Sequence, residues 1–336
     1  MTSYMFNDMK IKQVPEDFIV DEVIQLKLVK DRTNYVIFKL SKNNWDSFKV
    51  MNNLSKALNI KNKLIGYAGN KDKIAITSQY VSFYRIPKER IERIKMHDVR
   101  LEFVGYAHDR INLGDLDGND FIITLRDLDK EVVIPKNIQL ENYFGDQRFG
   151  NKANTHLVGK AIIKKDFKLA CELLNITISN NDFIFELRKQ PRRLLRFYIS
   201  SYQAFIWNRL LSDFIKKQKN SFKISSNSGD LYLSKSSIEN FKLPLISFDS
   251  ELSDELKVIL EEENISLKDF IIPQMPELTT ETVYRNAFID VKDISYEYSD
   301  DELNKNKLKI VIKFFLPKGC YATMLLSKLE SYLNEN

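Results

Sequence analysis

The sequence predicts an α+β fold in which a mainly antiparallel sheet is interrupted by a second domain and then resumed. Strand-like alternation of apolar and polar residues dominates the chain as far as about residue 125, and helical periodicity takes over from about residue 155. Alternation returns near residue 287, which favours the insertion of one domain into another. The 336 residues, 43% hydrophobic and 29% charged, suffice for two globular domains.

The first part of the chain begins with two predicted strands and a helix. Residues 18–40 alternate apolar and polar side chains, as do two half-buried strands joined by a turn around Asp31. The apolar residues then recur at helical spacing, at Phe48, Met51, Leu54 and Leu58. Asn44 and Asp46 both suit the N-cap of this helix, because their side chains accept hydrogen bonds from the first turn.

The remaining elements follow the same two patterns. Up to residue 125 the sequence predicts a strand at 64–68, a polar loop, a strand at 74–86, a charged helix at 88–95, and strands at 99–107 and 121–125, the last preceded by a turn at 114–118. Beyond residue 150 it predicts helices at 155–175 and 192–217, polar and acidic segments over 220–264, strands at 287–294 and 308–315, and a helix at 322–333.

Charge and cysteine content narrow the class of protein. The net charge of +5 is compatible with nucleic acid but too small to demonstrate it, although one segment crowds Arg188, Lys189, Arg192, Arg193 and Arg196. Cys171 and Cys320 lack a CxxC spacing, so neither a disulfide framework nor a thiolate zinc site is indicated. The N-terminus has no apolar signal region, and no apolar run nears the ~18 residues of a membrane span. We therefore expect a cytoplasmic protein without a membrane partner.

Motifs that the sequence lacks disfavour several cofactor-dependent classes. His97, His108 and His156 show no HxxxH or HxE spacing, which argues against a zinc deaminase or a metalloprotease. No GxGxxG or GxxxxGK[ST] follows a predicted strand, which argues against Rossmann-type methyltransferases, dehydrogenases and P-loop enzymes. We therefore expect a reaction that needs no cofactor and no metal.

The loop GYAGNKDK, residues 66–73, presents one carboxylate between two lysines. Gly69 permits a tight backbone path, and Lys71 and Lys73 flank Asp72, which favours its ionised form. An ionised, aimed carboxylate can attack a glycosidic carbon or an electron-poor ring. An ordinary solvated loop has the same composition, and this segment alone favours that interpretation.

The segment NYFGDQRFG, residues 142–150, combines aromatics with amides and an arginine. Its rings can stack on an exposed base, Asn142 can read the edge of that base, and Arg148 can hold a phosphate. A turn whose aromatics fill the core is the alternative. The basic helix that begins at Arg192 and Arg193 likewise suits either phosphate binding or a solvated face.

Five segments, in this order, resemble the TruD family of tRNA pseudouridine synthases over most of the chain. They are KQVPEDFIVDE (12–22), GYAGNKDKIAITSQ (66–79), INLGDLDGNDFIITLR (111–126), NYFGDQRFG (142–150) and FFLPKGCYATMLLSKL (314–329). The corresponding family signatures are KxxPEDFxVxE, AGxKDxxAxTxQ, LGxLxGNxFxxxLR, NYFGxQRFG and FxLPxGxxATxxLREL. Five ordered motifs, two of them long, make coincidence improbable.

The resemblance implies a pseudouridine synthase catalytic domain at residues 1–154 and 286–336, interrupted by an α/β TRUD insertion domain at residues 155–285. It also implies an isomerase that converts a uridine of tRNA to pseudouridine without a cofactor. Bacterial relatives act at position 13 of tRNA, notably tRNA(Glu), and eukaryotic relatives reach other RNA sites. A non-catalytic RNA-binding or RNA-chaperone protein on the same scaffold is the alternative, as is another cofactor-free RNA-base enzyme. We expect a monomer.

By the same resemblance, Asp72 matches the family nucleophile and Lys12 the basic residue paired with it. The residues that match the uridine pocket are Phe18, Asn142 and Tyr321, and Phe144 belongs to the pocket signature; we also expect Arg148 to bind the substrate. We also expect RNA phosphate contacts from Lys71, Lys73, Arg192 and Arg193. Tyr321 stands where some relatives have phenylalanine, and Ser327 stands where the family often has arginine. Two routes remain open for the nucleophile: attack at the sugar, or abstraction of a sugar proton to give a glycal.

Overall fold

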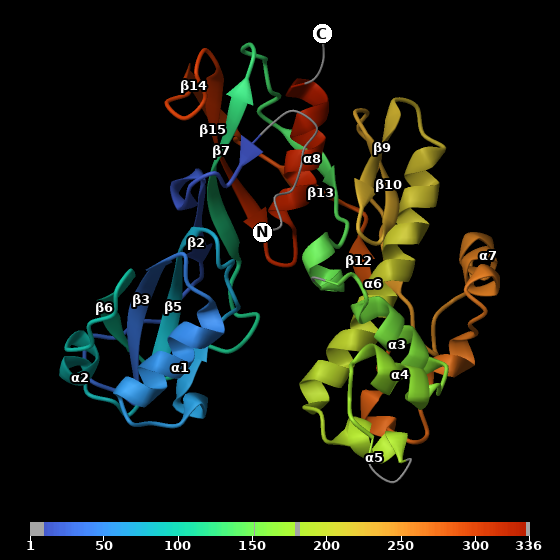
Figure 1. Ribbon diagram of the computed structural model, residues 1–336, viewed down its shortest axis with the longest axis horizontal. Helices are drawn as coiled ribbons and strands as arrows, with labels where there is room; N and C mark the ends of the chain where they lie inside the picture. The colour runs from blue at the N-terminus through green and yellow to red at the C-terminus, as the bar shows by residue number, and fades with distance from the viewer. Residues whose placement is uncertain (1–9, 151, 179–181, 334–336) are drawn as a thin grey trace. The chain divides into compact units, whose positions relative to one another are not determined.

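Residues 10–150, 152–178 and 182–333 are described by a computed structural model, shown in Figure 1. The chain divides into two compact units. Unit 1 comprises the described residues of Met1–Ile138, Val291–Ala322 and Leu329–Asn336, and unit 2 comprises those of Gln139–Asp290 and Thr323–Lys328. Both units mix helices with strands, so the predicted α+β class is confirmed, whereas the insertion of residues 155–285 stays a prediction.

Unit 1 is built on a sheet that has nine strands among the described residues. The strands are β1 (Lys10–Ile11), β2 (Phe18–Val23), β3 (Tyr35–Asn43), β4 (Ile65–Tyr67), β5 (Ile76–Tyr84), β6 (Val99–Ala107), β7 (Gly118–Leu128), β14 (Ser295–Asp300) and β15 (Leu308–Pro317). Their order is β14-β15-β7-β2-β5-β3-β6, with β1 beside β7 and β4 beside β5. The pairings are antiparallel except that of β2 with β5, which is parallel.

The turn expected around Asp31 does not pair the first two long strands. β2 ends at Val23 and β3 begins at Tyr35, and β5 lies between them in the sheet. The connection over residues 24–34 is much longer than the two-residue loop of a tight hairpin, so a later strand has room to insert. Both expected strands are therefore present, but they are not neighbours.

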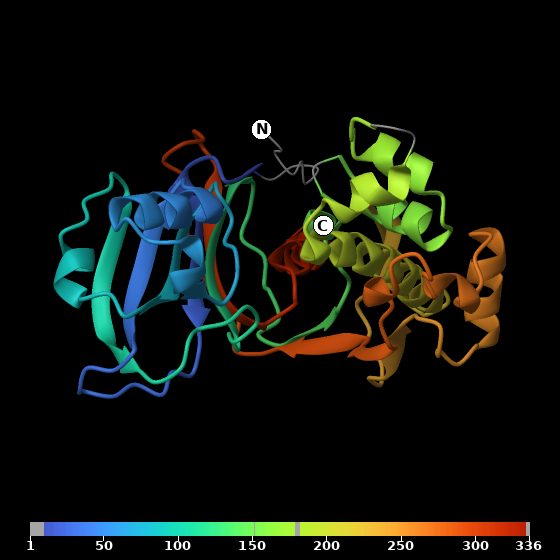
Figure 2. The same ribbon diagram turned by 90° about the horizontal axis from the view of Figure 1, so that it is seen from below.

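Helix α1 (Ser47–Ala57) lies across the strands of unit 1, as Figure 2 shows. Of its two candidate caps, Asp46 is the N-cap, because its side chain accepts the Lys49 N–H at 2.9 Å. The residues that pack against β3 and β5 are Val50, Met51, Leu54 and Leu58. Each fully buried leucine or valine stabilises the fold by about 1.5–3 kcal/mol. Phe48, expected on this face, is 60% exposed, because the buried stripe begins at Ser47 instead.

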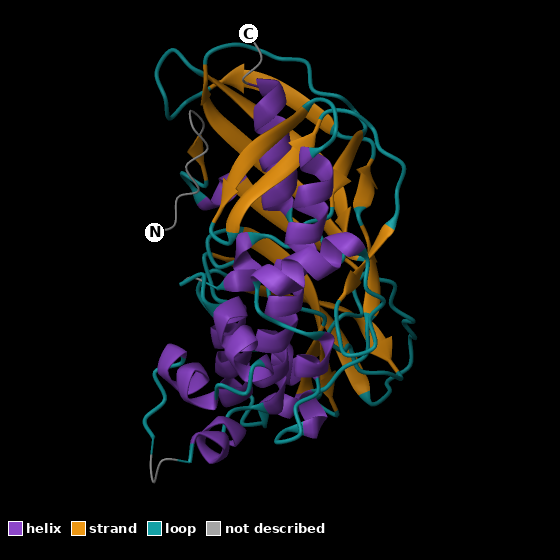
Figure 3. Cartoon of the chain, turned by 90° about the vertical axis from the view of Figure 1, so that its right-hand side faces the viewer, coloured by secondary structure: helices purple, strands orange, loops and turns teal. Residues whose placement is uncertain are grey.

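Unit 2 is organised around α6 (Arg192–Lys216), a helix of 25 residues. α3 (Thr155–Ile163) packs along it, and α4 (Phe167–Leu173) and α5 (Phe183–Arg188) extend this helical layer (Figures 1 and 3). At Gly159, α3 and α6 approach so closely that a Cβ there would lie 2.1 Å from the Tyr198 carbonyl oxygen. Glycine is required at this crossing, because any larger side chain would push α3 away from α6.

The single helix predicted at residues 155–175 is in fact two helices. Lys165 has a left-handed backbone with φ of 61°, which ends α3. The Asp166 side chain then caps α4 by accepting the Leu169 N–H at 3.0 Å. An N-cap inside a continuous apolar pattern was therefore the signal of the break.

Residues 220–264, which we expected only to form polar and acidic segments, contain regular structure. β9 (Ser221–Ser226) and β10 (Gly229–Ser234) form a hairpin, β11 (Lys242–Leu245) pairs with β12 (Val283–Asn286), and α7 (Asp254–Glu262) follows the N-cap Ser253. The other elements are β8 (Ile138–Glu141), β13 (Phe288–Val291), α2 (Lys88–Glu92), α8 (Ala322–Leu333) and the 3₁₀ turns η1 (Pro15–Asp17), η2 (Asn62–Leu64), η3 (Asp146–Phe149), η4 (Leu267–Phe270) and η5 (Pro276–Leu278). Within the described part of the chain, no helix combines the length and the apolar character that crossing a membrane takes.

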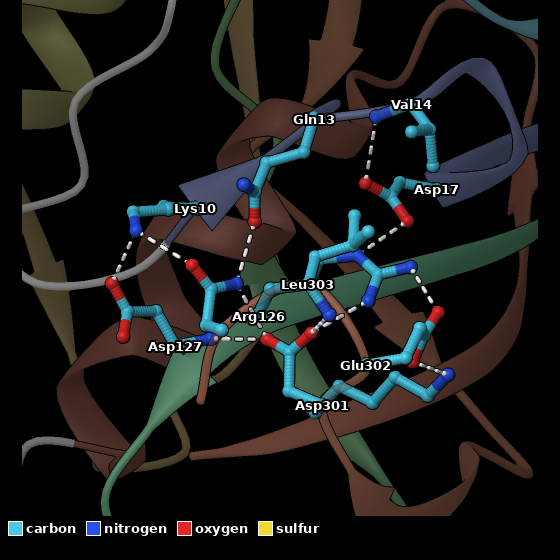
Figure 4. Close-up of polar contacts among 11 residues, drawn as sticks. Lys10, Gln13, Val14, Asp17, Arg126, Asp127, Asp301, Glu302 and Leu303 are labelled. Carbon is cyan, nitrogen blue, oxygen red and sulfur yellow. Dashed lines mark hydrogen bonds and ion pairs between the residues drawn. The ribbon is translucent and has the colours of Figure 1, made fainter. Parts of the chain in front are cut away.

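A buried arginine of β7 ties three parts of unit 1 together (Figure 4). Arg126 is 4% exposed. Its Nε lies 2.8 Å from Asp17 Oδ1, and its Nη1 lies 2.8 Å from Asp301 Oδ1. Its Nη2 lies 3.0 Å from Glu302 Oε1. We call these four residues the Arg126 network, and each nitrogen of the guanidinium faces a different carboxylate in it.

The network keeps Asp301 ionised. Burial alone would raise the pKa of this carboxyl, but hydrogen bonds from the Asn304 side chain, from two backbone N–H groups and from Arg126 lower the pKa from 3.8 to about 2. An aspartate whose pKa falls on folding stabilises the protein above its unfolded pKa. That contribution is lost as the pH falls through the folded pKa.

Asp301→Asn should remove a pH-dependent part of the free energy of unfolding. The free energy of unfolding of the wild type should fall by about 2 kcal/mol relative to that of the variant as the pH falls from about 4 to about 2, because one pKa unit corresponds to about 1.4 kcal/mol. Urea unfolding over this pH range measures the difference. Asp300→Asn controls for the loss of one exposed negative charge, and a wild type and an Asp301 variant with parallel acid limbs would contradict this role of Asp301.

Candidate active site

The parallel pair in the sheet brings two segments of the chain to the same edge. β2 and β5 run in the same direction, with Ile19 opposite Ile76. The segments that lead into them, residues 12–17 and residues 68–75, therefore meet at one edge of the sheet. The first segment carries Lys12 and the second carries Asp72.

Lys12, Phe18 and Asp72 form the first group of expected site residues, and all three belong to unit 1. The Lys12 ammonium lies 3.0 Å from Asp72 Oδ2 and 3.8 Å from the centroid of the Phe18 ring. Phe18 is 4% exposed, whereas the Asp72 side chain is 37% exposed. The group thus presents an accessible carboxylate beside a cation that rests on an aromatic face.

Side chains from outside the loop fix its backbone. Ser47 Oγ, at the start of α1, accepts the Lys71 N–H at 3.0 Å and donates to the Lys71 carbonyl at 3.2 Å. Gln79 of β5 donates to the Gly69 carbonyl at 3.2 Å. The expectation that Gly69 permits a tight path is wrong, because its φ is not left-handed and a Cβ there would meet no atom within 4 Å. Ser47 and Gln79 set the path instead.

Lys71 points into unit 1 instead of toward solvent. Its side chain is 6% exposed, and its ammonium lies 2.9 Å from Glu22 Oε2 and donates to Asn119 Oδ1 at 2.6 Å. The Glu22 contact is an ion pair without hydrogen-bond geometry at Oε2, and Oε1 accepts the Tyr80 N–H at 3.0 Å. A lysine held by two inward partners locks the loop, which fits positioning better than the phosphate contact expected from the sequence.

Lys42 is a site residue that the sequence reasoning missed. Its ammonium donates to the backbone carbonyls of Asp72 and Trp45, each at 2.6 Å, and Lys42 is 1% exposed. Burial lowers the pKa of Lys42 from 10.5 to about 8, even though the charges of Asp72 and Asp46 act to raise it. A sequence signal existed, because Lys42 occupies the buried phase of β3, where Val36, Phe38 and Leu40 also lie.

Asn142, Phe144 and Arg148 form a second group, which belongs to unit 2. Arg285 joins it by donating to the backbone and side-chain oxygens of Asn142, and its guanidinium lies 4.2 Å from the centroid of the Phe144 ring. Arg148 lies 5.8 Å from the same ring and donates to Ser200 Oγ at 2.6 Å. Arg285 could not be predicted from the sequence, because it is 143 positions from Asn142 and belongs to none of the five motifs.

The other expected residues are placed separately. Tyr321, in unit 1, is half-buried directly before α8, and Ser327 donates to the Thr323 carbonyl at 3.1 Å within that helix. Lys73, Arg192 and Arg193 are exposed, and Arg192 also donates to the Glu277 carbonyl at 3.0 Å. Among the residues that the structure describes, no three or more His, Cys, Asp or Glu side chains are grouped as a metal site would require.

Known proteins resemble this chain in sequence and in fold. A profile of the family described as tRNA pseudouridine synthase D (TruD) matches residues 1–182 and 240–329. A relative in Methanococcoides burtonii named probable tRNA pseudouridine synthase D is 27% identical, over 94% of this chain and 92% of its own length. A relative of the same name in Methanosarcina acetivorans is 29% identical, over 94% of this chain and 91% of its own length. A Methanosarcina mazei crystal structure, titled as a putative tRNA pseudouridine synthase D, aligns with a TM-score of 0.68 and 26% identity, over 97% of this chain and 93% of that one.

Lys42→Met should change how stability depends on alkaline pH. The folded protein gives up the Lys42 proton near pH 8, whereas the unfolded chain keeps it to about 10.5. The wild type should therefore gain stability relative to the variant as the pH rises between these values. The gain should total roughly 3 kcal/mol, because one pKa unit is worth about 1.4 kcal/mol. Urea unfolding of both proteins across this range measures it.

Lys39→Met is the matched control on the same strand. Burial acts to lower the pKa of Lys39, but the hydrogen bond and charge of Asp21 raise it. Stability from Lys39 is therefore present below its unfolded pKa and lost as the pH rises through its folded pKa. The two substitutions should change the free energy of unfolding at alkaline pH in opposite directions relative to the wild type. Changes of the same sign and size in both variants would contradict the burial of the Lys42 ammonium.

Proposed function

The chain belongs to the TruD family of tRNA pseudouridine synthases, and from this premise we propose that Asp72 acts in breaking the glycosidic bond of the target uridine. The enzyme is an isomerase, because pseudouridine is uridine with its base attached through C5 in place of N1. The reaction breaks one C–N bond, forms one C–C bond and loses a proton from C5 while N1 gains one. A charged and fixed carboxylate that substrate can reach suits this chemistry.

The observation that carries the assignment is the 3.0 Å ion pair between Lys12 and Asp72, in a loop whose backbone is held on both sides. Lys12 pairs with the carboxylate at this distance, and the 37% exposure of the Asp72 side chain leaves it accessible to the sugar. Phe18 supports the Lys12 ammonium through its ring.

Two routes use this carboxylate. In direct attack, Asp72 displaces uracil at C1′ and forms an ester, which breaks again when C5 bonds to C1′. In the glycal route, Asp72 takes the C2′ proton as the N1–C1′ bond breaks, and returns it when C5 adds to C1′. In both routes the C5 proton leaves last and the aspartate is regenerated. Because no net oxidation occurs, neither route uses a redox cofactor.

Base recognition is assigned to Asn142, Phe144 and Tyr321, and phosphate binding to Arg148. The Asn142 amide is oriented by its bond to the Asn286 carbonyl at 3.0 Å and by Arg285. An amide that is already oriented reads a base edge with less loss of side-chain entropy. The Tyr321 hydroxyl adds a polar group where some relatives carry phenylalanine.

The proposed substrate is tRNA, with the uridine at position 13 as the target, for example in tRNA(Glu). The proposed catalytic domain comprises residues 1–154 and 286–336, and residues 155–285 form the insertion domain. The exposed cations Lys73, Arg192 and Arg193 are assigned to RNA phosphates.

Asp72→Asn keeps the shape of the side chain and removes its charge. Binding of tRNA should survive, whereas release of tritium from C5 of labelled tRNA uridines should slow roughly 10⁴-fold or more. Asp230→Asn is the control, because Asp230 forms a similar pair with Lys223 at 3.1 Å on the β9–β10 hairpin. Wild-type turnover by the Asp72 variant would refute its role, and a non-catalytic RNA-binding protein would release no tritium in any form.

Replacing Arg192 and Arg193 together by glutamine tests the basic start of α6. The tRNA dissociation constant should rise, and the slope of its logarithm against log salt should flatten by roughly 0.7–0.9 for each phosphate that the variant no longer neutralises. Lys257→Gln removes an exposed charge from α7 and serves as the control. An unchanged slope in the double variant would return this helix to the interpretation of a solvated face.

A further inference from the structure

The backbone at Lys12 adopts a conformation that needs support. Its φ is 59°, in the left-handed region that a residue with a Cβ occupies only where its surroundings fix it. Lys12 lies between β1 and the turn η1, and its ammonium reaches Asp72. What holds residues 10–17 therefore also determines where this ammonium lies.

The side of the segment before Lys12 is anchored on β7. Lys10 and Ile11 pair with Arg126 and Leu125 in the antiparallel register of β1 with β7. The Lys10 ammonium also lies 2.8 Å from Asp127 Oδ2 and donates to Asn304 Oδ1 at 2.7 Å. The chain thus enters Lys12 from a fixed strand.

The segment that follows Lys12 is anchored by two hydrogen bonds, one accepted by Gln13 and the other by Asp17. Asn304 Nδ2 donates to Gln13 Oε1 at 2.8 Å, and the Val14 N–H donates to Asp17 Oδ2 at 3.1 Å. The other oxygen of Asp17 lies 2.8 Å from Arg126 Nε, and both side chains are almost fully buried, at 1% and 5% exposed. Figure 4 shows Gln13 and Val14 beside the Arg126 network, to which Asp17 belongs.

Arg126 is itself fixed from the opposite side. The Asp301 carboxylate accepts a hydrogen bond from Arg126 Nη1. It also accepts hydrogen bonds from the backbone N–H groups of Asp127 and Leu303, each at 3.0 Å. A guanidinium that meets three carboxylates has one orientation, which a lysine ammonium would not reproduce. Buried ion pairs add little net stability compared with apolar packing, so their fixed geometry explains this arrangement better than stability does.

We propose that Arg126 and Asp17 are positioning residues for the reaction, because they hold residues 10–17 in the path that delivers the Lys12 ammonium to Asp72. This inference rests on the roles proposed above for Lys12 and Asp72. Arg126 and Asp17 touch no reacting atom, and their effect passes through Lys12. They act on Lys12 in the same way as Ser47, Gln79 and the buried lysines act on the Asp72 loop.

Asp17→Asn is the first test, because the amide keeps an acceptor for the Val14 N–H and loses the charge that holds Arg126. In the folded variant, kcat should fall roughly 10- to 100-fold while KM for tRNA stays unchanged, since small misplacements of catalytic groups have effects of this size. In a Lys12→Met background the same substitution should cost nothing further. Unchanged kcat in the folded variant, or losses that multiply in the double variant, would overturn the proposal.

Asp269→Asn is the matched control. In η4, Asp269 Oδ2 accepts the Ser266 N–H at 2.8 Å, as Asp17 accepts the Val14 N–H in η1, but its neighbouring cations are Lys164 and Lys165. The Asp269 variant should leave kcat unchanged; an equal loss would mean that neutralising any such capping carboxylate suffices, which would overturn the proposal. If Asp17→Asn does not fold, Asn304→Ala removes the bonds to Lys10 and Gln13 and should show the same coupling to Lys12.

A measurement independent of catalysis separates this proposal from the assignment of Asp72. The rate at which an acetylating reagent modifies Lys12, read by mass spectrometry against Lys39 as internal reference, should rise several-fold in Asp17→Asn, because the Lys12 side chain is only 18% exposed when positioned. Increased reactivity together with an active Asp72→Asn enzyme would leave the positioning intact and reject the nucleophile. Unchanged reactivity would overturn the positioning whatever Asp72 does.

Discussion

One constraint organises unit 1: a carboxylate beside a cation is fixed within a loop and still partly exposed. Lys12 supplies the cation, 3.0 Å from Asp72. Lys42 and Lys71 fix the loop from inside, because one ammonium bonds the Asp72 carbonyl and the other ties the loop to Glu22. The cation proposed to influence the chemistry is thus distinct from those that hold the backbone. This separation lets the loop be rigid while its side chain stays accessible.

The topology of the sheet serves the same constraint. If β2 and β5 were antiparallel, the segments leading into them would start at opposite edges, and strands of six and nine residues would separate Lys12 from Asp72 by roughly 20–30 Å. The parallel pairing with Ile19 opposite Ile76 brings both segments to one edge. Its cost in connectivity is the long route through β3, α1 and β4 that the chain takes from one strand to the other. The single parallel pair in an otherwise antiparallel sheet therefore explains why Lys12 and Asp72 meet.

Features that local contacts determine could be predicted from the sequence. The helical spacing after Asp46 and its capping side chain suffice to predict α1, and the five motifs suffice to predict the family. Features that depend on distant residues could not be predicted. Arg126 meets partners 109 and 175 positions away, and Arg285 meets Asn142 at 143 positions, so no window of sequence contains these contacts. The break at Lys165 has a local signal, the N-cap Asp166, but the apolar pattern continues through it and so predicts one longer helix.

We propose that this chain makes pseudouridine in tRNA by means of Asp72. Carbodiimide mapping of tRNA tests it most directly, because pseudouridine has the mass of uridine but retains the reagent. The comparison uses cells from which the gene has been deleted, and the same cells expressing either the wild-type or the Asp72→Asn protein at equal levels. We predict that one site, position 13, loses its signal in the deleted cells and regains it with the wild type alone. Restoration by the asparagine protein, or no change at any site in the deleted cells, would contradict the claim.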